Sequence, residues 1–290
     1  GDGSSLRADD GHRWWIEPQA NSGRRLAPRW MTTLEMAEAI KDGTFRRLSI
    51  RRPDPIDVPD VDLPIDPYLL GVWLGDGDAR QGTIVQHISD IPELRSIIEA
   101  AGYETTPHKG DKSFGVLNIR GHLASLGLLA NKHVPDIYLK GSSDQRLALL
   151  QGLMDTDGTV IPGAPRPGRC TFGNSNKSLV DAVNFLALSL GFRTRVYHSP
   201  ATISKTPSSD ASEIQEFWRV VFNADASTPC PFRLSRKAAR CGRKLSRRTS
   251  WITVTEVVPD GEAEVQCILI DHPSHVFLAG ERLVPTGNCW

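Results

Sequence analysis

The sequence predicts a mixed fold of about two domains, in which a central α+β segment is followed by a segment of short strands. The chain has 290 residues, more than one domain of ordinary size requires. From about residue 77 to residue 200, stretches with apolar residues at helical spacing are interspersed with stretches of alternating apolar and polar residues. Beyond about residue 250, short apolar runs are separated by turn residues, which is typical of strands.

The composition is that of an ordinary globular protein without a membrane partner. Hydrophobic residues make up 39% and charged residues 23% of the chain, and no apolar run reaches the length of a membrane span. The five cysteines are odd in number and irregularly spaced, which argues against a disulfide framework and against a zinc ribbon. We therefore expect a reducing, cytoplasmic location. Because the first residue is Gly and not Met, we expect a fragment or a processed piece.

Local signals predict the elements in order along the chain. A capping pattern that begins at Thr32 predicts a short helix over residues 33–41. Five prolines between residues 53 and 67 predict a linker. Helical spacing predicts helices over residues 91–101, 123–129, 147–154 and 176–190. Alternation and turn residues predict strands over residues 193–198, 217–222, 251–258, 264–270 and 276–279.

Two segments of the central region repeat one pattern. Residues 69–77 (LLGVWLGDG) and 150–158 (LQGLMDTDG) each run from an apolar helix with an interior glycine into an Asp-Gly pair. Interior glycine costs helix stability, which makes sense if the two helices pack too closely for a side chain. This packing would place Asp76 beside Asp157, a pair of carboxylates suited to Mg²⁺. The alternative is that each motif is only a buried helix that ends in an Asp-Gly turn.

A basic stretch without acidic residues follows the central segment. Its predicted role is to contact DNA phosphates without reading sequence, and the candidate residues are Arg233, Arg236, Lys237, Arg240, Arg243 and Lys244. The formal net charge of zero does not exclude such a partner, because a local basic patch is sufficient. The alternative is a solvated charged face.

The two repeated segments resemble the paired LAGLIDADG motifs of intein-encoded homing endonucleases. Residues 131–135 (NKHVP) and 172–177 (FGNSNK) resemble two further segments of that family, and the resemblance covers about residues 62–200. It implies a monomeric α+β domain of pseudo-twofold symmetry whose two curved sheets straddle the major groove of double-stranded DNA, and Mg²⁺-assisted cleavage of both strands. By this resemblance Asp76 and Asp157 hold the metal, and Lys132 assists near a scissile phosphate. The alternative for Lys132 is a solvated loop lysine.

The end of the chain resembles the C-terminal splicing blocks of inteins. Residues 265–271 and 275–280 lead to an Asn288-Cys289 pair. An asparagine amide can attack its own backbone carbonyl and break the following peptide bond, and a cysteine can accept an acyl group and return it to its own amine. The resemblance implies an all-β, horseshoe-shaped Hint domain that splices without a cofactor and has the flanking exteins as partners. Cys289 and Trp290 would belong to the C-extein.

Residues 3–12 resemble the N-terminal block whose histidine, here His12, activates the first scissile bond. Trp14, Cys267 and Thr286 together resemble the Trp-Cys-Thr signature of class 3 inteins, found in phage and mycobacterial replicative-helicase inteins. In that class Cys267 would attack the upstream junction directly, and Trp14 and Thr286 would shape the pocket. The alternative is an ordinary class 1 intein in which Cys267 is a buried strand cysteine.

The resulting fold prediction is a Hint splicing domain interrupted by the endonuclease domain. We expect the Hint domain in residues 1–58 and 247–288, with its first strands missing, and the endonuclease in residues 59–246. Gly287 replaces the histidine that most inteins use for asparagine cyclisation, so His275, or else His272, would assist. Three alternatives to a fully active element stay open: an intein that only binds DNA, one that only cleaves at its C-terminal junction, and a free-standing endonuclease, against which Asn288-Cys289 argues.

Overall fold

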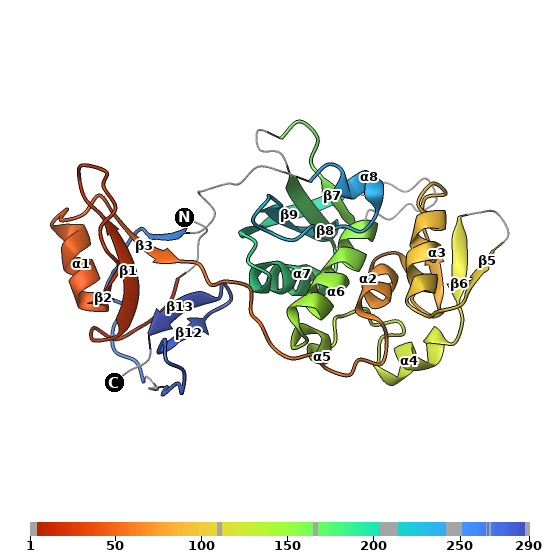
Figure 1. Ribbon diagram of the computed structural model, residues 1–290, viewed down its shortest axis with the longest axis horizontal. Coiled ribbons are helices and arrows are strands. Elements are labelled where there is room, and N and C mark those ends of the chain that lie inside the picture. The colour runs from red at the N-terminus through yellow and green to blue at the C-terminus, as the bar shows by residue number, and fades with distance from the viewer. Residues whose placement is uncertain are drawn as a thin grey trace. The chain divides into compact units, whose positions relative to one another are not determined.

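A computed structural model gives the fold and describes all residues except 1–4, 109–111, 165–167, 204–213, 242–250, 265, 267 and 288–290. The chain divides into two compact units. Unit 1 comprises Gly1–Asp54 and Arg247–Trp290, and unit 2 comprises Pro55–Ser246 (Figure 1). The two ends of the chain therefore build one unit, and the other unit is inserted between them. No helix among the described residues is long and apolar enough to cross a membrane.

Unit 1 is built on an antiparallel sheet with the strand order β11-β3-β1-β2. Its strands are β1 (Arg13–Gln19), β2 (Arg29–Thr32), β3 (Arg47–Arg51) and β11 (Trp251–Val254). Alternate residues of β1 are buried, as expected for a strand with one face on a core. That core includes Trp14, Ile16, Met31, Leu48 and Ile50. Two strands from opposite ends of the chain, β3 and β11, thus pair in one sheet.

Among its described residues, unit 1 also contains one helix and one hairpin. The helix predicted over residues 33–41 is confirmed as α1 (Thr33–Lys41), and its capping box joins Thr32 and Glu35 as expected. The strand predicted over residues 276–279 is confirmed as β12 (Val276–Ala279), which pairs with β13 (Val284–Gly287).

The two other strands predicted near the end of the chain differ from the structure. β11 ends at Val254 and not at residue 258, because its partner β3 is only five residues long. Residues 264, 266 and 268–270 form no strand, and Leu269 is largely exposed. Apolar alternation in this segment therefore does not correspond to burial against a sheet.

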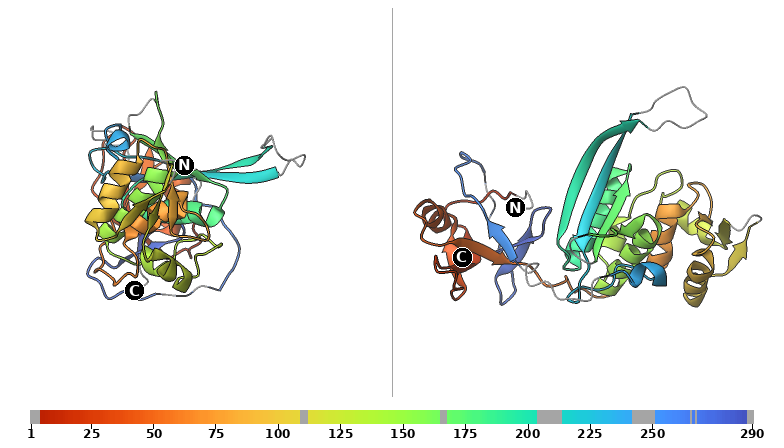
Figure 2. Two further views of the ribbon diagram at one scale, coloured as in Figure 1. Left: turned by 90° about the vertical axis from the view of Figure 1, so that its right-hand side faces the viewer. Right: turned by 90° about the horizontal axis from the view of Figure 1, so that it is seen from above.

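Unit 2 is centred on two helices, α2 (Pro67–Asp76) and α6 (Ser143–Thr156), which lie side by side (Figure 1). One sheet has the order β4-β6-β5, formed by β4 (Thr83–Val85), β6 (Ser113–Val116) and β5 (Thr105–Pro107). The other has the order β7-β8-β10-β9, formed by β7 (Gly158–Val160), β8 (Arg169–Asn174), β10 (Ile214–Asn223) and β9 (Thr194–Ile203). β9 and β10 are the longest strands and extend beyond the rest of their sheet (Figure 2).

Shorter and flanking helices complete unit 2. They are α3 (Ile91–Ala100), α4 (Ile119–Ser125), α5 (Asp136–Leu139), α7 (Lys177–Ser189) and α8 (Ser235–Ala238). The helix predicted over residues 123–129 lies earlier, as α4, because Gly127 adopts a left-handed φ of 67° that a helix cannot contain. The helices predicted over 91–101, 147–154 and 176–190 are confirmed, with ends that differ by a few residues.

The elements of unit 2 repeat in order. The first half (residues 67–135) runs α2, β4, α3, β5, β6, α4, and the second half (residues 143–241) runs α6, β7 and β8, α7, β9, β10, α8. An isolated bridge between Gly77 and Ile84 stands where Gly158 of β7 pairs with Phe172 of β8. Each half therefore places a sheet and a flanking helix after its central helix, which is an internal repeat of structure.

Candidate functional site

The two central helices touch backbone to backbone at their glycines. A Cβ atom added to Gly71 would lie 2.4 Å from the carbonyl oxygen of Leu149, and one added to Gly152 would lie 2.2 Å from that of Tyr68. Nearer the helix ends, a Cβ atom on Gly75 would lie 2.0 Å from Oγ1 of Thr156. The predicted close packing is confirmed, and it places the C-terminal ends of α2 and α6 together.

Asp76 and Asp157 lie at these two helix ends. Asp76 is the last residue of α2, and Asp157 caps the C-terminus of α6. Burial, and then repulsion by Asp157, raises the pKa of Asp76 to about 6. Burial also raises the pKa of Asp157. Because each helix C-terminus carries partial negative charge, both carboxylates lie where a cation is favoured.

Each carboxylate is oriented by an amide side chain from the sheet of its own half. Nε2 of Gln86, which follows β4, donates to Oδ2 of Asp76 at 2.7 Å. Nδ2 of Asn174, the last residue of β8, donates to Oδ2 of Asp157 at 3.0 Å. The two amides take equivalent places in the repeat, although the residue types differ.

At the C-terminal end of each central helix, a lysine donates hydrogen bonds to backbone carbonyls and in this sense closes the helix end. Nζ of Lys132 donates to the carbonyl oxygens of Gly75 at 3.1 Å and Gly77 at 2.7 Å. Burial lowers the pKa of Lys132, against the opposing effect of Asp157 and Asp76. Lys132 is therefore a half-buried group beside the two carboxylates and not a solvated loop lysine.

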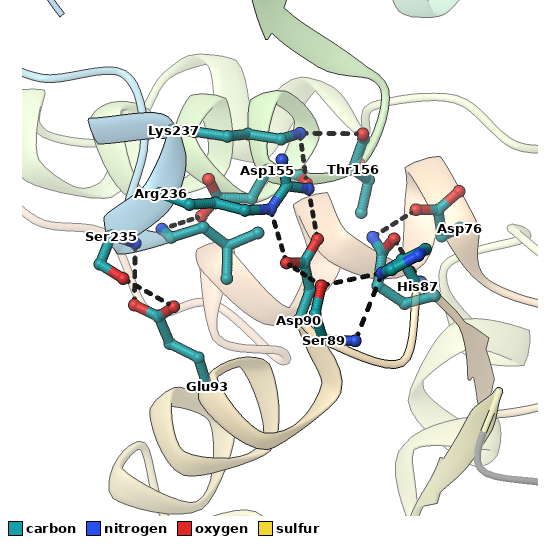
Figure 3. Close-up of polar contacts among 12 residues, drawn as sticks. Asp76, His87, Ser89, Asp90, Glu93, Asp155, Thr156, Ser235, Arg236 and Lys237 are labelled. Carbon is teal, nitrogen blue, oxygen red and sulfur yellow. Dashed lines mark hydrogen bonds and ion pairs between the residues drawn. The ribbon is translucent and has the colours of Figure 1, made fainter. Parts of the chain in front are cut away.

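Lys237 is the counterpart of Lys132 in the second half. Its side chain is only 6% exposed, and Nζ donates to the carbonyl oxygens of residues 154, 155, 156 and 158 at 2.7–3.2 Å. Figure 3 shows Lys237 beside Asp155 and Thr156. Burial lowers its pKa to about 8. The prediction that Lys237 belongs to an exposed, phosphate-contacting patch is wrong, because a buried ammonium engaged by four carbonyls presents no free surface. Lys237 instead closes the end of α6.

Two arginines of the basic stretch contact other side chains of unit 2, although both are exposed. Arg236 forms a two-contact ion pair with Asp90, and Nε of Arg233 donates to Oε1 of Gln151 at 2.8 Å. The guanidinium of Arg233 also lies over the Tyr68 ring, 4.4 Å from its centroid. Arg240 is exposed, and Arg243 and Lys244 lie outside the described residues. The stretch lacks acidic residues in sequence, but Asp90, the residue before α3, supplies one for Arg236.

Asp155 anchors the segment that carries Lys237. Its side chain is 0% exposed, and Oδ2 accepts from Tyr68 Oη at 2.8 Å and from the backbone N–H groups of Arg233 and Leu234 at 3.0 and 3.1 Å. Burial raises the pKa of Asp155. The first half has the buried apolar Leu74 at this position.

The donor set fits a magnesium ion. Among the described residues there is no cluster of three or more His, Cys, Asp or Glu side chains, so no all-protein cage is present. Mg²⁺ commonly uses one or two carboxylates and completes its shell with water and phosphate oxygens. Asp76 and Asp157 repel one another, and the amides of Gln86 and Asn174 that bind them carry no charge. These hydrogen bonds therefore do not neutralise the carboxylates, which favours a bound cation.

In unit 1, three of the predicted residues form a cluster. Nε2 of His12 hydrogen-bonds to Oγ1 of Thr286, and the His12 and Trp14 rings meet edge to face with centroids 5.0 Å apart. Thr286 is 2% exposed. Burial lowers the pKa of His12, with Asp9 opposing. Of the other predicted groups, Cys267, Asn288 and Cys289 lie outside the described residues.

Gly287 has no room for a side chain. A Cβ atom there would lie 2.8 Å from the carbonyl oxygen of Arg13 and 2.7 Å from the Trp30 ring. A histidine at this position would therefore require Trp30 or the backbone at Arg13 to move. Val276 pairs with Gly287, so His275 directly precedes the strand that faces the end of β13.

Sequence reasoning missed Gln86, Asn174, Asp155 and the true place of Lys237. Their spacing from the motifs differs between the halves, so no fixed offset identifies them. The available signal for Lys237 was its neighbours Phe232 and Leu234, apolar residues within a run of charges.

The family comparison matches the second half. Residues 144–221 match a family model described as a LAGLIDADG-like domain. This part of the chain is similar to that family. The chain is also homologous to a replicative DNA helicase DnaB of Mycobacterium intracellulare, with 31% identity over 307 aligned positions. The alignment covers 99% of this chain and 49% of the helicase, so the chain spans about half the length of that relative.

Solved structures of the homing endonuclease I-DmoI are also similar. Mesophilic variants match with 15% identity and a TM-score of 0.34 over 55% of this chain and 87% of theirs. The complex of I-DmoI with DNA and Ca matches with 15% identity and a TM-score of 0.35 over 55% of this chain and 82% of that one. Similarity this low adds nothing to the family match.

Proposed function

We propose that the protein is an intein that excises itself from a host protein and whose inserted LAGLIDADG-like domain cleaves double-stranded DNA at the unoccupied insertion site. The observation that carries the proposal is the pair of packed helix ends, each with an aspartate, an orienting amide and a lysine that donates to the carbonyls of the helix end. The homology to a replicative helicase supports a replicative helicase as the host protein, because an intein is translated within the same chain as its host.

For DNA cleavage, Asp76 and Asp157 would hold Mg²⁺ in contact with the attacked phosphate. When bound, the metal supplies positive charge that stabilises the phosphate as it is attacked. Gln86 and Asn174 hold the two carboxylates in the orientation in which they would bind Mg²⁺. Lys132 and Lys237 add fixed positive charge beside that position, where burial strengthens their electrostatic effect.

For splicing, we propose the class 3 route. The Cys267 thiolate attacks the carbonyl of the upstream junction and forms a thioester, and the junction amine leaves as the new N-terminus of the intein. The acyl group then passes to the Cys289 thiol, Asn288 cyclises and breaks the bond to Cys289, and an S-to-N shift restores a peptide bond. The contacts among His12, Trp14 and Thr286 support a shared pocket for these steps.

The nuclease is tested on a plasmid that carries the helicase gene sequence without the insertion. The full chain with Mg²⁺ is expected to linearise this plasmid and to leave a plasmid with the insertion intact. Asp76→Asn combined with Asp157→Asn should abolish cleavage, and Asp144→Asn, an exposed first-turn acid of α6, should not. Retention of the plasmid in a gel shift without cleavage would support the alternative of an element that only binds DNA.

Splicing is tested by intact mass. The coding region is expressed with upstream and downstream host sequence, and a ligated host protein plus a free intein are expected. Cys267→Ala with the first intein residue unchanged should block ligation, which separates class 3 from class 1. A precursor that breaks only after Asn288 would support the alternative of C-terminal cleavage alone.

A further inference from the structure

Each half of unit 2 closes its own helix end with a lysine, but the segment that carries this lysine is bound by the other half. Lys237 closes α6 of the second half, and its neighbour Arg236 is bound by Asp90 of the first half. Lys132 closes α2 of the first half, and its carbonyl is bound by Asn176 of the second half. Asp90 and Asn176 take equivalent places in the repeat, since each is the residue before the flanking helix of its half, α3 or α7.

The contact to the segment that carries Lys237 has several bonds, and the Arg236 side chain in it is 47% exposed. Asp90 is 2% exposed, and its carboxylate accepts from both Nε, at 2.6 Å, and a terminal nitrogen of Arg236 (Figure 3). In the first turn of α3, Glu93 accepts from the backbone N–H of Ser235 at 2.8 Å and from its hydroxyl at 3.1 Å. Glu93 thus satisfies the N-terminus of α8, a four-residue helix without a cap of its own.

The contact to the first-half lysine is a single amide hydrogen bond. Nδ2 of Asn176 donates to the carbonyl oxygen of Lys132 at 2.7 Å. Oδ1 of the same side chain accepts from Ser178 N at 3.0 Å and so caps α7. The two functions use different atoms of Asn176 and can be separated by substitution.

Short polar chains link both contacts to the aspartates. In the second half, Asn174 donates to Asp157 and accepts from Asn176 N at 2.8 Å. In the first half, Gln86 donates to Asp76 and accepts from His87 N at 2.7 Å, and Ser89 lies between His87 and Asp90. The aspartate of each half is therefore connected to the lysine segment of the opposite half.

We propose that Asp90 and Asn176 are positioning residues that place the active-site lysine of the opposite half, so that the two half-sites depend on each other. This inference rests on the proposed DNA cleavage for its kinetic consequence, but its structural content can be measured without DNA. A substitution of Asp90 or Asn176 should increase the mobility of the lysine segment in the opposite half. It should also slow the cleavage that the lysine of that opposite half assists.

The first test is backbone hydrogen exchange of the full chain. Asp90→Asn removes the ion pair without removing a helix cap, because the Asp90 side chain caps nothing. It should increase exchange in residues 231–241 and leave residues 126–135 unchanged. Asn176→Asp keeps the oxygen that caps α7 and loses the donor to the Lys132 carbonyl. It should therefore increase exchange in residues 126–135 and leave residues 231–241 unchanged. Asp144→Asn serves as the control. Increased exchange in both segments alike, or in neither, would overturn the proposal.

The second test is single-turnover nicking of a duplex labelled separately on each strand. Lys237→Met identifies the strand that depends on the second-half lysine, and Lys132→Met identifies the other. Asp90→Asn should slow the Lys237-dependent strand about tenfold with DNA affinity unchanged, and adding Arg236→Gln should slow it no further. Asn176→Asp should slow the other strand. If Asp90→Asn slows the Lys132-dependent strand, the crossed assignment is wrong. A wild-type chain that nicks neither strand would refute the proposed cleavage, while hydrogen exchange would still decide the crossed contacts.

Discussion

The two halves of unit 2 reach the same arrangement at their helix ends by different means. In the second half, the buried Asp155 holds the turn before α8, and Lys237 meets four carbonyls. In the first half, Leu74 stands in place of Asp155, and Lys132 meets two carbonyls from a loop tied by a hydrogen bond between Ala130 N and Ala79 O at 2.7 Å. The two halves share a lysine ammonium group at the end of the central helix, but different side chains hold the segment that carries this lysine. The halves should therefore respond differently to substitution except where their backbones meet and where equivalent amides bind the two aspartates.

The largest effect is expected at the shared contact. Gly71→Val would press Cβ against a carbonyl oxygen at 2.4 Å and force α2 and α6 apart, with a loss of about 4 kcal/mol or more in the free energy of unfolding of unit 2. Urea unfolding measures this loss. Gly121→Ala is the matched control, because Gly121 lies in α4 with nothing within 4 Å and should be neutral or slightly stabilising. Equal stability of the two variants would show that the helices can separate at little cost.

A second, somewhat smaller effect should distinguish the halves. Asp155→Leu gives the second motif the residue of the first, and it leaves the N–H groups of Arg233 and Leu234 unpaired. We expect a loss of about 3 kcal/mol and increased proteolysis near α8. Leu74→Ala, the matched change in the first half, should lower stability through a cavity and leave the α8 segment protected. Limited proteolysis followed by mass spectrometry separates the two outcomes.

The pKa of Asp76 predicts a pH-dependent effect of intermediate size. The pKa is about 6 in the folded protein and about 4 in an unfolded chain, so the folded state binds the proton more tightly. The free energy of unfolding should therefore fall as pH rises from about 4 to 6, by about 1–2 kcal/mol after allowance for partial exposure. Asp76→Asn should flatten this part of the profile in urea titrations without Mg²⁺. An unchanged slope would mean that Asp76 does not carry the proton.

The smallest effects should be equal in the two halves. Gln86→Ala and Asn174→Ala each remove one hydrogen bond that favours the ionised aspartate, so each should raise the pKa of its partner, Asp76 or Asp157, and change stability by about 1 kcal/mol or less. Carboxyl carbon NMR titration reports both aspartates in one sample. A shift of both aspartates by a single substitution would show that the pair titrates as one coupled unit.

Local features of the site could be predicted, and long-range ones could not. The repeated motif indicated the glycine contact and the two aspartates, because an interior glycine and an Asp-Gly end are both properties of neighbouring residues. The capping box at Thr32 likewise predicted α1. The burial of Lys237 depends on carbonyls about 80 residues away, and the ion pair of Arg236 depends on Asp90. A run of cations looks solvated in sequence when the residues that neutralise it lie in another segment.

The pairing of β3 with β11 joins strands from the two ends of the chain, with Arg51 opposite Trp251. Closing an unstructured loop of about 200 residues costs only about 3 kcal/mol more than closing one of about 10 residues, since the cost grows with the logarithm of length. Unit 1 can therefore accommodate an insertion as large as unit 2 at a modest cost in chain entropy. The cost in time is larger. At about 5–20 residues per second, β3 waits about 10–40 seconds for β11 to be synthesised. During that interval the outer edge of β3 is open to any other strand, so translation speed through unit 2 sets how long the nascent sheet is exposed to mispairing.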